Sequence, residues 1–201
     1  NQVDAEMMLS LLKNAGFEIC SAEAEADAII INTCGFIEAA KAEAIENILE
    51  ASNYKVDGNC KALIVTGCLA ERYRDDVTEE IPEVDVCVGI GSNGKIAEIV
   101  KNAIEGKKEN SYGDKTDLDL NGDRVLGGYP FSTYLKIGDG CDNCCTYCAI
   151  PKIRGRMRSR KIEDCVAEAK KLAERGVTEL IVVAQDTTAY GTDIYGEAKL
   201  P

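Results

Sequence analysis

The sequence predicts an α/β protein made of two consecutive parts, and three observations support this. Short apolar runs alternate with helical patterns, which is typical of a mostly parallel sheet. The chain has 201 residues, 45% of them hydrophobic, which is ample for a core but long for one ordinary domain. Residues 1–130 carry 25 acidic against 12 basic side chains, whereas residues 131–201 carry 10 against 11. We therefore expect a domain over 1–106, a linker over 107–130 and the truncated start of a second domain over 131–201.

The first part alternates helices and strands in chain order. Apolar residues at helical spacing from Met7 to Leu12, with Gly16 beyond them, predict a helix. The apolar runs "AIIINT" and "ALIVTG" predict two buried strands, each followed by a cysteine and then by helical sequence. The stretch "VDVCVGIGSNGKIAEIVKNAIEG" predicts a further strand, a Gly-rich turn with Ser92 as a possible N-cap, and another helix.

The second part reads as one βαβ unit. The polar, Gly-rich residues 107–130 show no sustained periodicity and are expected to connect the parts. The sequence then predicts, in order, a strand "STYLKIG", a cysteine-rich loop, a basic stretch, a helix over 162–175 and an apolar strand "TELIVVAQD". Strands separated by a helix pair in parallel, so this part is expected to begin a parallel sheet.

The cysteine content points to metal or thiol chemistry. The sequence has ten cysteines and no histidine. It also has no apolar run near eighteen residues and no signal-peptide pattern, so we expect a cytoplasmic protein without a membrane span. In that reducing compartment, cysteines are metal ligands, reactive thiols or small buried side chains more often than disulfides. The absence of histidine favours sites made of thiolates alone.

The stretch "GDGCDNCCTYC" over 138–148 holds four of these cysteines. Its two C-x-x-C pairs abut without a spacer, which suits zinc poorly, and the ferredoxin spacing also fails. Cys141, Cys145 and Cys148 alone give C-x₃-C-x₂-C directly after a predicted strand, which resembles the radical SAM enzymes. Three thiolates would ligate three irons of a 4Fe-4S cluster and leave the fourth open for S-adenosylmethionine, with Cys144 as a bystander.

The motifs of the first part resemble one group within that superfamily. The stretches "NTCGFIEAAKAEAI", "VTGCLAERY" and "AQDTTAYGTDIYG", with the opening "NQVDAEMM", are similar to the radical SAM methylthiotransferases. The resemblance implies a TIM-like partial barrel after an N-terminal domain with a second 4Fe-4S cluster. Cys34 and Cys68 would ligate that cluster, because each ends a strand at the carboxyl edge of one parallel sheet. The family also has a cysteine just ahead of Asn1, which this sequence lacks, so the second cluster misses its first ligand here.

Within the methylthiotransferases, the chain is most similar to the branch that modifies an aspartate of small-subunit ribosomal protein twelve. The resemblance implies a methylthio transfer to the aspartate β-carbon, with S-adenosylmethionine as cosubstrate and an electron donor such as flavodoxin or ferredoxin. The acidic first part suits a basic ribosomal protein, and nucleic-acid contact is expected only indirectly or through a missing C-terminal domain. The alternatives are a tRNA adenosine methylthiotransferase and, from another class, an iron-sulfur electron carrier or a structural metal-binding module.

The remaining candidate residues surround the cysteine-rich loop. The basic stretch "KIRGRMRSRK" places Arg154, Arg156, Arg158 and Arg160 on one face if it is extended, and one or two of them are expected to bind ligand carboxylates. Tyr147, Arg154 and Gln185 are the residues we expect to bind the cosubstrate, and no catalytic side chain is assigned. The remaining cysteines are expected to be small structural residues, namely Cys20, Cys60, Cys87 and Cys165.

Overall fold

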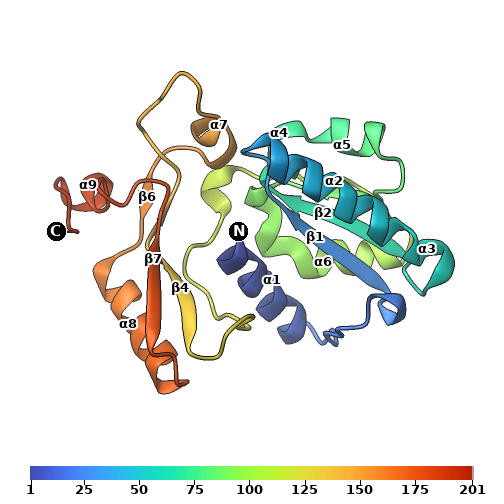
Figure 1. The fold of residues 1–201 in the computed structure, drawn as a ribbon, viewed down its shortest axis with the longest axis horizontal. Coiled ribbons are helices and arrows are strands. Elements are labelled where there is room, and N and C mark those ends of the chain that lie inside the picture. The colour runs from blue at the N-terminus through green and yellow to red at the C-terminus, as the bar shows by residue number, and fades with distance from the viewer. Residues whose placement is uncertain (201) are drawn as a thin grey trace. The chain divides into compact units, whose positions relative to one another are not determined.

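The computed structural model describes residues 1–200, which form two compact units: unit 1, Asn1–Leu118, and unit 2, from Asp119 onward. Both contain parallel strands joined through helices, so the predicted α/β class is confirmed (Figure 1). None of the helices within the described residues is long and apolar enough to span a membrane.

Unit 1 is built on a three-stranded parallel sheet in the order β1-β2-β3. Its strands are β1 (Ala28–Thr33), β2 (Ala62–Gly67) and β3 (Val86–Val88). Its helices are α1 (Gln2–Asn14), α2 (Glu38–Ser52), α3 (Tyr54–Asp57), α4 (Cys68–Tyr73), α5 (Asp75–Glu80) and α6 (Ile96–Ile104), with 3₁₀ turns η1 (Glu23–Glu25), η2 (Ile90–Lys95) and η3 (Lys115–Asp117). These elements match the predicted order of strands and helices.

The central strand β2 explains the uninterrupted apolar run in the sequence. Every residue of β2 is buried, because helices cover both faces of the sheet. Leu63 and Val65 face a core formed with α2, α4 and α5, whereas Ala62 and Ile64 face a second core formed with α1 and α6. Side chains alternate between the faces of a strand, so one continuous run supplies two cores. Ser92 is not the N-cap of α6, which starts after Lys95, because residues 90–95 form η2 instead.

The boundary between the units falls inside the segment 107–130 that was predicted as a linker. The first part of this segment packs on unit 1 as an addition to its sheet. Ser111 forms a parallel bridge with Val88, and its backbone N–H donates to the Cys87 carbonyl. The Asn110 side-chain oxygen accepts the N–H of Cys87 at 2.8 Å. Asn110 and Ser111 thus pair with the edge strand β3 through hydrogen bonds. A pattern of hydrophobic residues does not reveal such pairing by polar residues.

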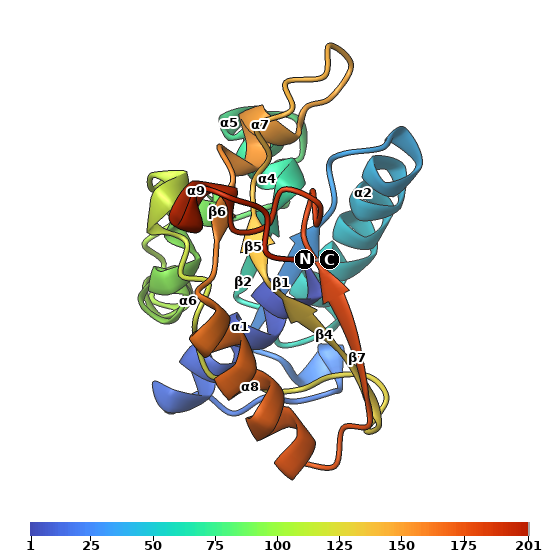
Figure 2. The ribbon, with the colours of Figure 1, turned by 90° about the vertical axis from the view of Figure 1, so that its left-hand side faces the viewer.

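Unit 2 contains the expected βαβ unit. Its strands are β4 (Ser132–Lys136), β5 (Gly138–Asp139), β6 (Arg158–Ser159) and β7 (Glu179–Val183), and its helices are α7 (Ile150–Arg154), α8 (Ile162–Glu174) and α9 (Thr192–Tyr195). Strands β4 and β7 pair in parallel, with α8 in the connection between them, and β5 pairs with β6 in an antiparallel ladder. Figure 2 shows α8 alongside β4 and β7. The ladder of β5 and β6 lies at the base of the loop that carries the clustered cysteines.

Candidate functional site

Two neighbouring strand ends in unit 1 bring Cys34 and Cys68 to the same edge of the sheet. Cys34 directly follows β1, and Cys68 directly follows β2 as the first residue of α4. Thr33 lies opposite Gly67 in the parallel register, so the two cysteines leave the sheet side by side. Carboxyl ends of parallel strands are where ligands bind in α/β proteins. The structure therefore brings together the two cysteines that were predicted for the second cluster.

The first residue of the chain lies at this edge as well. The Asn1 side-chain nitrogen donates to the Thr33 carbonyl at 2.7 Å, and the Asn1 carbonyl accepts from the Asn32 side chain at 2.8 Å. The Cys68 thiol donates to the Asn1 side-chain oxygen, with the sulfur and oxygen 3.5 Å apart. Cys68 is only 5% exposed and Cys34 is half-buried. Asn1, the N-cap residue of α1, and the two cysteines thus lie at the same edge of the sheet.

Glycine is required where β2 turns into α4. Gly67 has a φ of +95°, a backbone conformation that only glycine adopts readily. A Cβ atom at this position would overlap the Thr33 carbonyl oxygen and would lie 2.6 Å from the Asn32 side-chain oxygen. The missing side chain lets the end of β1 and the start of α4 approach closely. The distance between the strand ends that carry Cys34 and Cys68 depends on this glycine.

A buried carboxylate anchors the helix that starts at Cys68. The Glu71 side chain is fully buried and accepts the backbone N–H of Ile90 at 3.1 Å. Its other oxygen accepts a hydrogen bond from the Arg74 guanidinium at 3.1 Å. These bonds tie α4, the helix that begins at Cys68, to the turn after β3.

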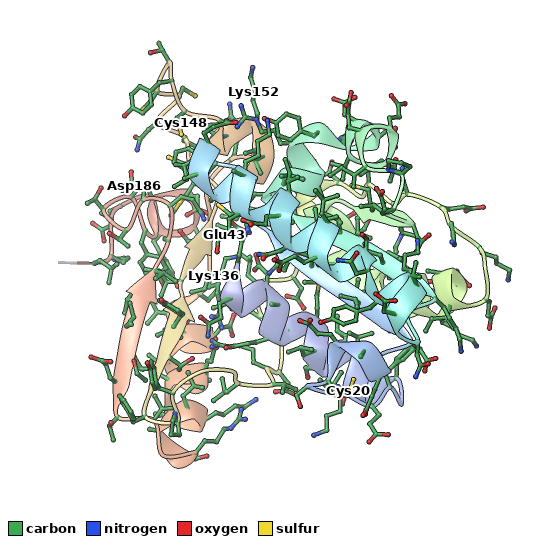
Figure 3. All side chains as sticks on the ribbon, turned by 45° about the vertical axis from the view of Figure 1, so that its right-hand side comes forward. Cys20, Glu43, Lys136, Cys148, Lys152 and Asp186 are labelled. Atoms are coloured by element: carbon green, nitrogen blue, oxygen red, sulfur yellow. The ribbon has the colours of Figure 1, made fainter. Side chains whose placement is uncertain are left out.

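The cysteine loop, residues 141–148, connects β5 to α7 in unit 2. Its first cysteine is held by the backbone, because the Cys141 N–H donates to the Gly155 carbonyl at 3.2 Å. A turn at its end is closed by the N–H of Cys148 and the carbonyl of Cys145, 3.0 Å apart. Cys144 adopts a φ of +49°, and both Cys144 and Cys145 are exposed. Figure 3 shows Cys148 in this loop and Asp186 in the loop after β7.

The thiols of the loop are not arranged around one point. Across residues 1–200, no three Cys, Asp or Glu side chains lie close enough together to hold a metal ion. Exposed side chains sample several rotamers until a ligand fixes them, and metal binding is coupled to the ordering of its ligands. The structure thus places Cys141, Cys145 and Cys148 on one short loop but leaves their convergence as a prediction.

The three residues predicted to bind the cosubstrate lie in different environments. Tyr147 is 87% exposed, and the negative charge of the nearby Cys145 thiolate, followed by a hydrogen bond to it, raises the pKa of the Tyr147 hydroxyl. Gln185 is exposed two residues after the end of β7, at the carboxyl edge of the unit 2 sheet. Arg154 is 3% exposed and donates to the Asp139 carboxylate at 3.1 Å.

The expectation of an extended basic stretch with four arginines on one face is wrong. Residues 150–154 form helix α7, which starts with Pro151 in its first turn, a position that suits proline. Arg154 is therefore helical, and Arg160 lies beyond β6 with its guanidinium bound to Glu168. Arg156 is exposed, whereas Arg154 and Arg160 are both buried. Long-range ion pairs, and not the alternation of the sequence, decide where these side chains point.

The sequence did not reveal two carboxylates of unit 2 that are each shared by two cations, one of them fully buried and the other partly buried. Asp139 is 0% exposed and accepts from Lys136 at 2.9 Å as well as from Arg154. Glu168 on α8 accepts from Arg124 at 2.6 Å and from Arg160. In the sequence, Asp139 stands out only as an acidic residue between Lys136 and the first cysteine of the loop. Its second partner, Arg154, is fifteen residues away and could not be recognised from the local sequence.

Arg124 and Arg160 also bind the backbone of β4. Arg124 donates to the Tyr134 carbonyl at 2.8 Å, and Arg160 donates to the Lys136 carbonyl at 2.7 Å. Both carbonyls belong to alternate residues and therefore point to the same side of the strand. In the described part of the chain, β4 pairs along its length with β7 alone. The two guanidinium groups thus occupy hydrogen-bond acceptors on the opposite edge of β4.

A hollow of about 370 Å³ lies next to these arginines in unit 2. Arg124, Arg160 and Glu168 line it, together with Lys171 and Arg175 from α8 and the turn after it. Both signs of charge are present around it, and the two buried arginines are already bound to Glu168. These side chains form a structural ion-pair network.

The other cysteines follow the expected structural role in three cases. Cys60, Cys87 and Cys165 are buried, and burial raises the pKa of each thiol, that of Cys87 to about 11. The expectation is wrong for Cys20, which is exposed in the segment before η1 (Figure 3). Residues 17–22 around Cys20 lie in no helix or strand.

Two family models match separate parts of the chain. Residues 1–89 match the model of the Uncharacterized protein family UPF0004, and residues 135–200 match the Radical SAM superfamily. The whole chain is 53% identical to a ribosomal protein uS12 methylthiotransferase RimO of Desulforamulus reducens and covers 46% of that protein. It is 52% identical to the proteins of the same name from Clostridium tetani and Acetivibrio thermocellus, covering 45% and 46% of them. The chain thus spans about half the length of these relatives, and the predicted resemblance is confirmed.

Proposed function

We propose that this chain is part of a radical SAM methylthiotransferase that adds a methylthio group to the β-carbon of an aspartate in ribosomal protein uS12. The observation that carries the proposal is the C-x₃-C-x₂-C loop, which follows β4 and β5 in a parallel βαβ unit. All 201 residues of the chain align with uS12 methylthiotransferases and cover about half of their length. Unit 1, with Cys34 and Cys68 at one sheet edge, would serve a second cluster.

The donor sets fit iron-sulfur clusters. The sequence has no histidine, and each site offers thiols as its soft ligands, which is the ligand type of such clusters. Cys141, Cys145 and Cys148 would hold the first cluster, and Cys34 and Cys68 would contribute to the second. Asn1 lies beside Cys68, so a cysteine directly before it, as in the resembled family, would lie within reach of the same edge. Bound at three thiolates, a 4Fe-4S cluster would offer its open iron to S-adenosylmethionine and supply the electron that cleaves it.

The residues of this chain would bind, orient and shield the reactants. Gln185 and Tyr147 are exposed at the carboxyl side of the unit 2 sheet, where they can donate hydrogen bonds to the polar groups of S-adenosylmethionine. Arg154, whose buried guanidinium is bound to Asp139, is the third residue that we propose for this ligand, at the carboxylate of S-adenosylmethionine. A primary carbon radical abstracts hydrogen from C–H and S–H groups within its reach, so the site must hold the β-carbon of the substrate aspartate as the nearest donor.

The charge of the chain favours a basic protein as substrate. The formal net charge is −12, and the excess of acid lies in the first 130 residues. An acidic surface attracts a basic ribosomal protein and repels the phosphates of a tRNA, which argues against the tRNA-modifying alternative. We expect the reaction to take place in the cytoplasm, with a flavodoxin or ferredoxin as the electron donor.

The test uses the full-length protein, reconstituted with iron and sulfide without oxygen and then reduced. Cys141→Ala, Cys145→Ala and Cys148→Ala are each expected to abolish 5′-deoxyadenosine formation from S-adenosylmethionine, whereas Cys144→Ala is expected to retain it. Methylthiolation of purified uS12, followed by mass spectrometry, tests the acceptor, with tRNA as the competing substrate. A colourless, zinc-containing protein would support a structural module instead. An iron-containing protein that cleaves no S-adenosylmethionine would support an electron carrier.

A further inference from the structure

Asp139 occupies the last position before the turn into the cysteine loop, and its carboxylate is completely buried. One oxygen accepts from the Lys136 ammonium at 2.9 Å and from the Arg154 guanidinium at 3.1 Å. The other oxygen accepts the backbone N–H of Gly140 at 3.0 Å. A carboxylate removed from water needs such partners, so this arrangement is sensitive to the loss of any member.

The contact between Asp139 and Arg154 joins the two ends of the cysteine loop. Asp139 precedes the loop, and Arg154 is the last residue of the helix that follows it. Next to this ion pair, the Cys141 N–H donates to the Gly155 carbonyl at 3.2 Å. Gly140 between them has a φ of +80°, and a Cβ there would overlap the Arg156 carbonyl. The backbone therefore closes tightly at the loop base, with Cys141 inside the closure.

The middle of the cysteine loop is more exposed than its two ends. Cys144 and Cys145 are exposed, whereas Cys141 and Cys148 are half-buried, and of these two Cys141 lies next to the ion pair. Within the loop, the contrast means that Cys141 has a defined position before any ligand binds. The remaining thiols can then move toward it.

We propose that Asp139 is a positioning residue that fixes Cys141 for iron-sulfur binding by clasping both ends of the cysteine loop. The inference rests on the proposed function of that loop and deepens it. Asp139 does not touch the reactants; it acts through Arg154, Gly140 and the backbone of Cys141. Residues that orient metal ligands in this way commonly contribute 10- to 100-fold in metal affinity.

Unit 2 offers a matched control for this role. Glu168 is a partly buried carboxylate, 15% exposed, that also accepts from two buried cations, Arg124 and Arg160, but it lies on α8 and bonds to no residue of the cysteine loop. Asp139→Asn and Glu168→Gln both replace such a carboxylate with an amide of the same shape. A general loss of stability affects both variants, whereas a change at Cys141 is expected only for the first.

The experiment uses the full-length protein with Cys34→Ala and Cys68→Ala, so that bound iron reports on the cysteine loop. Two quantities are measured: the rate at which a chelator removes the cluster, followed by visible absorbance, and the rate at which iodoacetamide alkylates Cys141 in the cluster-free protein, followed by mass spectrometry. Asp139→Asn is expected to lose the cluster about tenfold faster or more and to expose Cys141 to faster alkylation. Alkylation of Cys144, which is already exposed, is the internal reference and is expected to be unchanged.

The outcomes separate the inference from the function on which it rests. Equal rates in Asp139→Asn and Glu168→Gln would overturn the positioning role. If the parent binds no iron at the loop, the proposed function fails, yet the alkylation comparison, which needs no iron, still decides whether Asp139 positions Cys141. Should Asp139→Asn not fold, Lys136→Met keeps the carboxylate and its bond to Arg154. That variant is expected to accelerate alkylation of Cys141 to a smaller degree, and an unchanged rate would refute the proposal.

Discussion

Gly67→Ala tests how the two strand ends at the unit 1 edge are brought together. The backbone at Gly67 has a φ of +95° and a ψ of −159°, a region that costs other residues about 1 to 3 kcal/mol. The added methyl group would lie 2.8 Å from the Thr33 nitrogen and would overlap the Thr33 carbonyl oxygen. These are backbone atoms of β1, so they can yield only if β1 moves away from β2. Overpacking of this kind costs about 1 to 3 kcal/mol more.

The expected loss in the free energy of unfolding is therefore about 2 to 6 kcal/mol, a large part of the total for a protein of this kind. Urea unfolding followed by far-ultraviolet circular dichroism measures it. Gly94→Ala is the matched control, because no atom lies within 4 Å of the Cβ position at Gly94. It is expected to change the free energy by no more than about 0.5 kcal/mol. A Gly67→Ala protein within about 1 kcal/mol of the parent would refute the close-approach argument.

Three further predictions concern single side chains. In the full-length protein, Cys34→Ala or Cys68→Ala is expected to stop methylthiolation of uS12 while 5′-deoxyadenosine still forms, and a normal yield of methylthiolated uS12 would contradict a second cluster at this edge. Arg154→Gln breaks a buried ion pair and is expected to lower the free energy of unfolding by about 3 to 5 kcal/mol, whereas the exposed Arg156→Gln is expected to be nearly neutral in the same urea titration. Burial raises the pKa of Cys87 from 9.0 to about 11, so its contribution to stability is complete below pH 9 and is lost as the pH rises to about 11. Cys87→Ala is expected to flatten this part of the pH profile, and an unchanged profile would rule out Cys87 as its source.

The sequence predicted the elements whose signal is local or repeated. The apolar runs of β1 and β2 and the helical pattern of α8 were recognisable, because burial imposes a regular spacing on each of them. The proximity of Cys34 and Cys68 followed from the same reasoning, since two parallel strands end at one edge. These predictions needed no knowledge of which side chains meet across the fold.

Contacts between distant residues explain what the sequence could not show. Arg154 was expected in an extended stretch, but it ends α7 and meets Asp139, an arrangement that depends on the loop folding back on its base. Ser111 was expected in a linker, but its backbone extends the sheet of unit 1 beside Val88. The orientation of the loop thiols is a further case, because their final positions would depend on the metal itself.

Two arginines that bind the backbone carbonyls of β4 bear on whether this strand can pair with a strand of another molecule. A strand edge with unpaired carbonyls is a template on which another chain can add a strand, and this is a route to aggregation. Arg124 and Arg160 occupy the carbonyls of Tyr134 and Lys136 and place bulky charged groups along that edge. Glu168 holds both guanidinium groups in place. The ion-pair network therefore disfavours the pairing of β4 with a strand of another molecule.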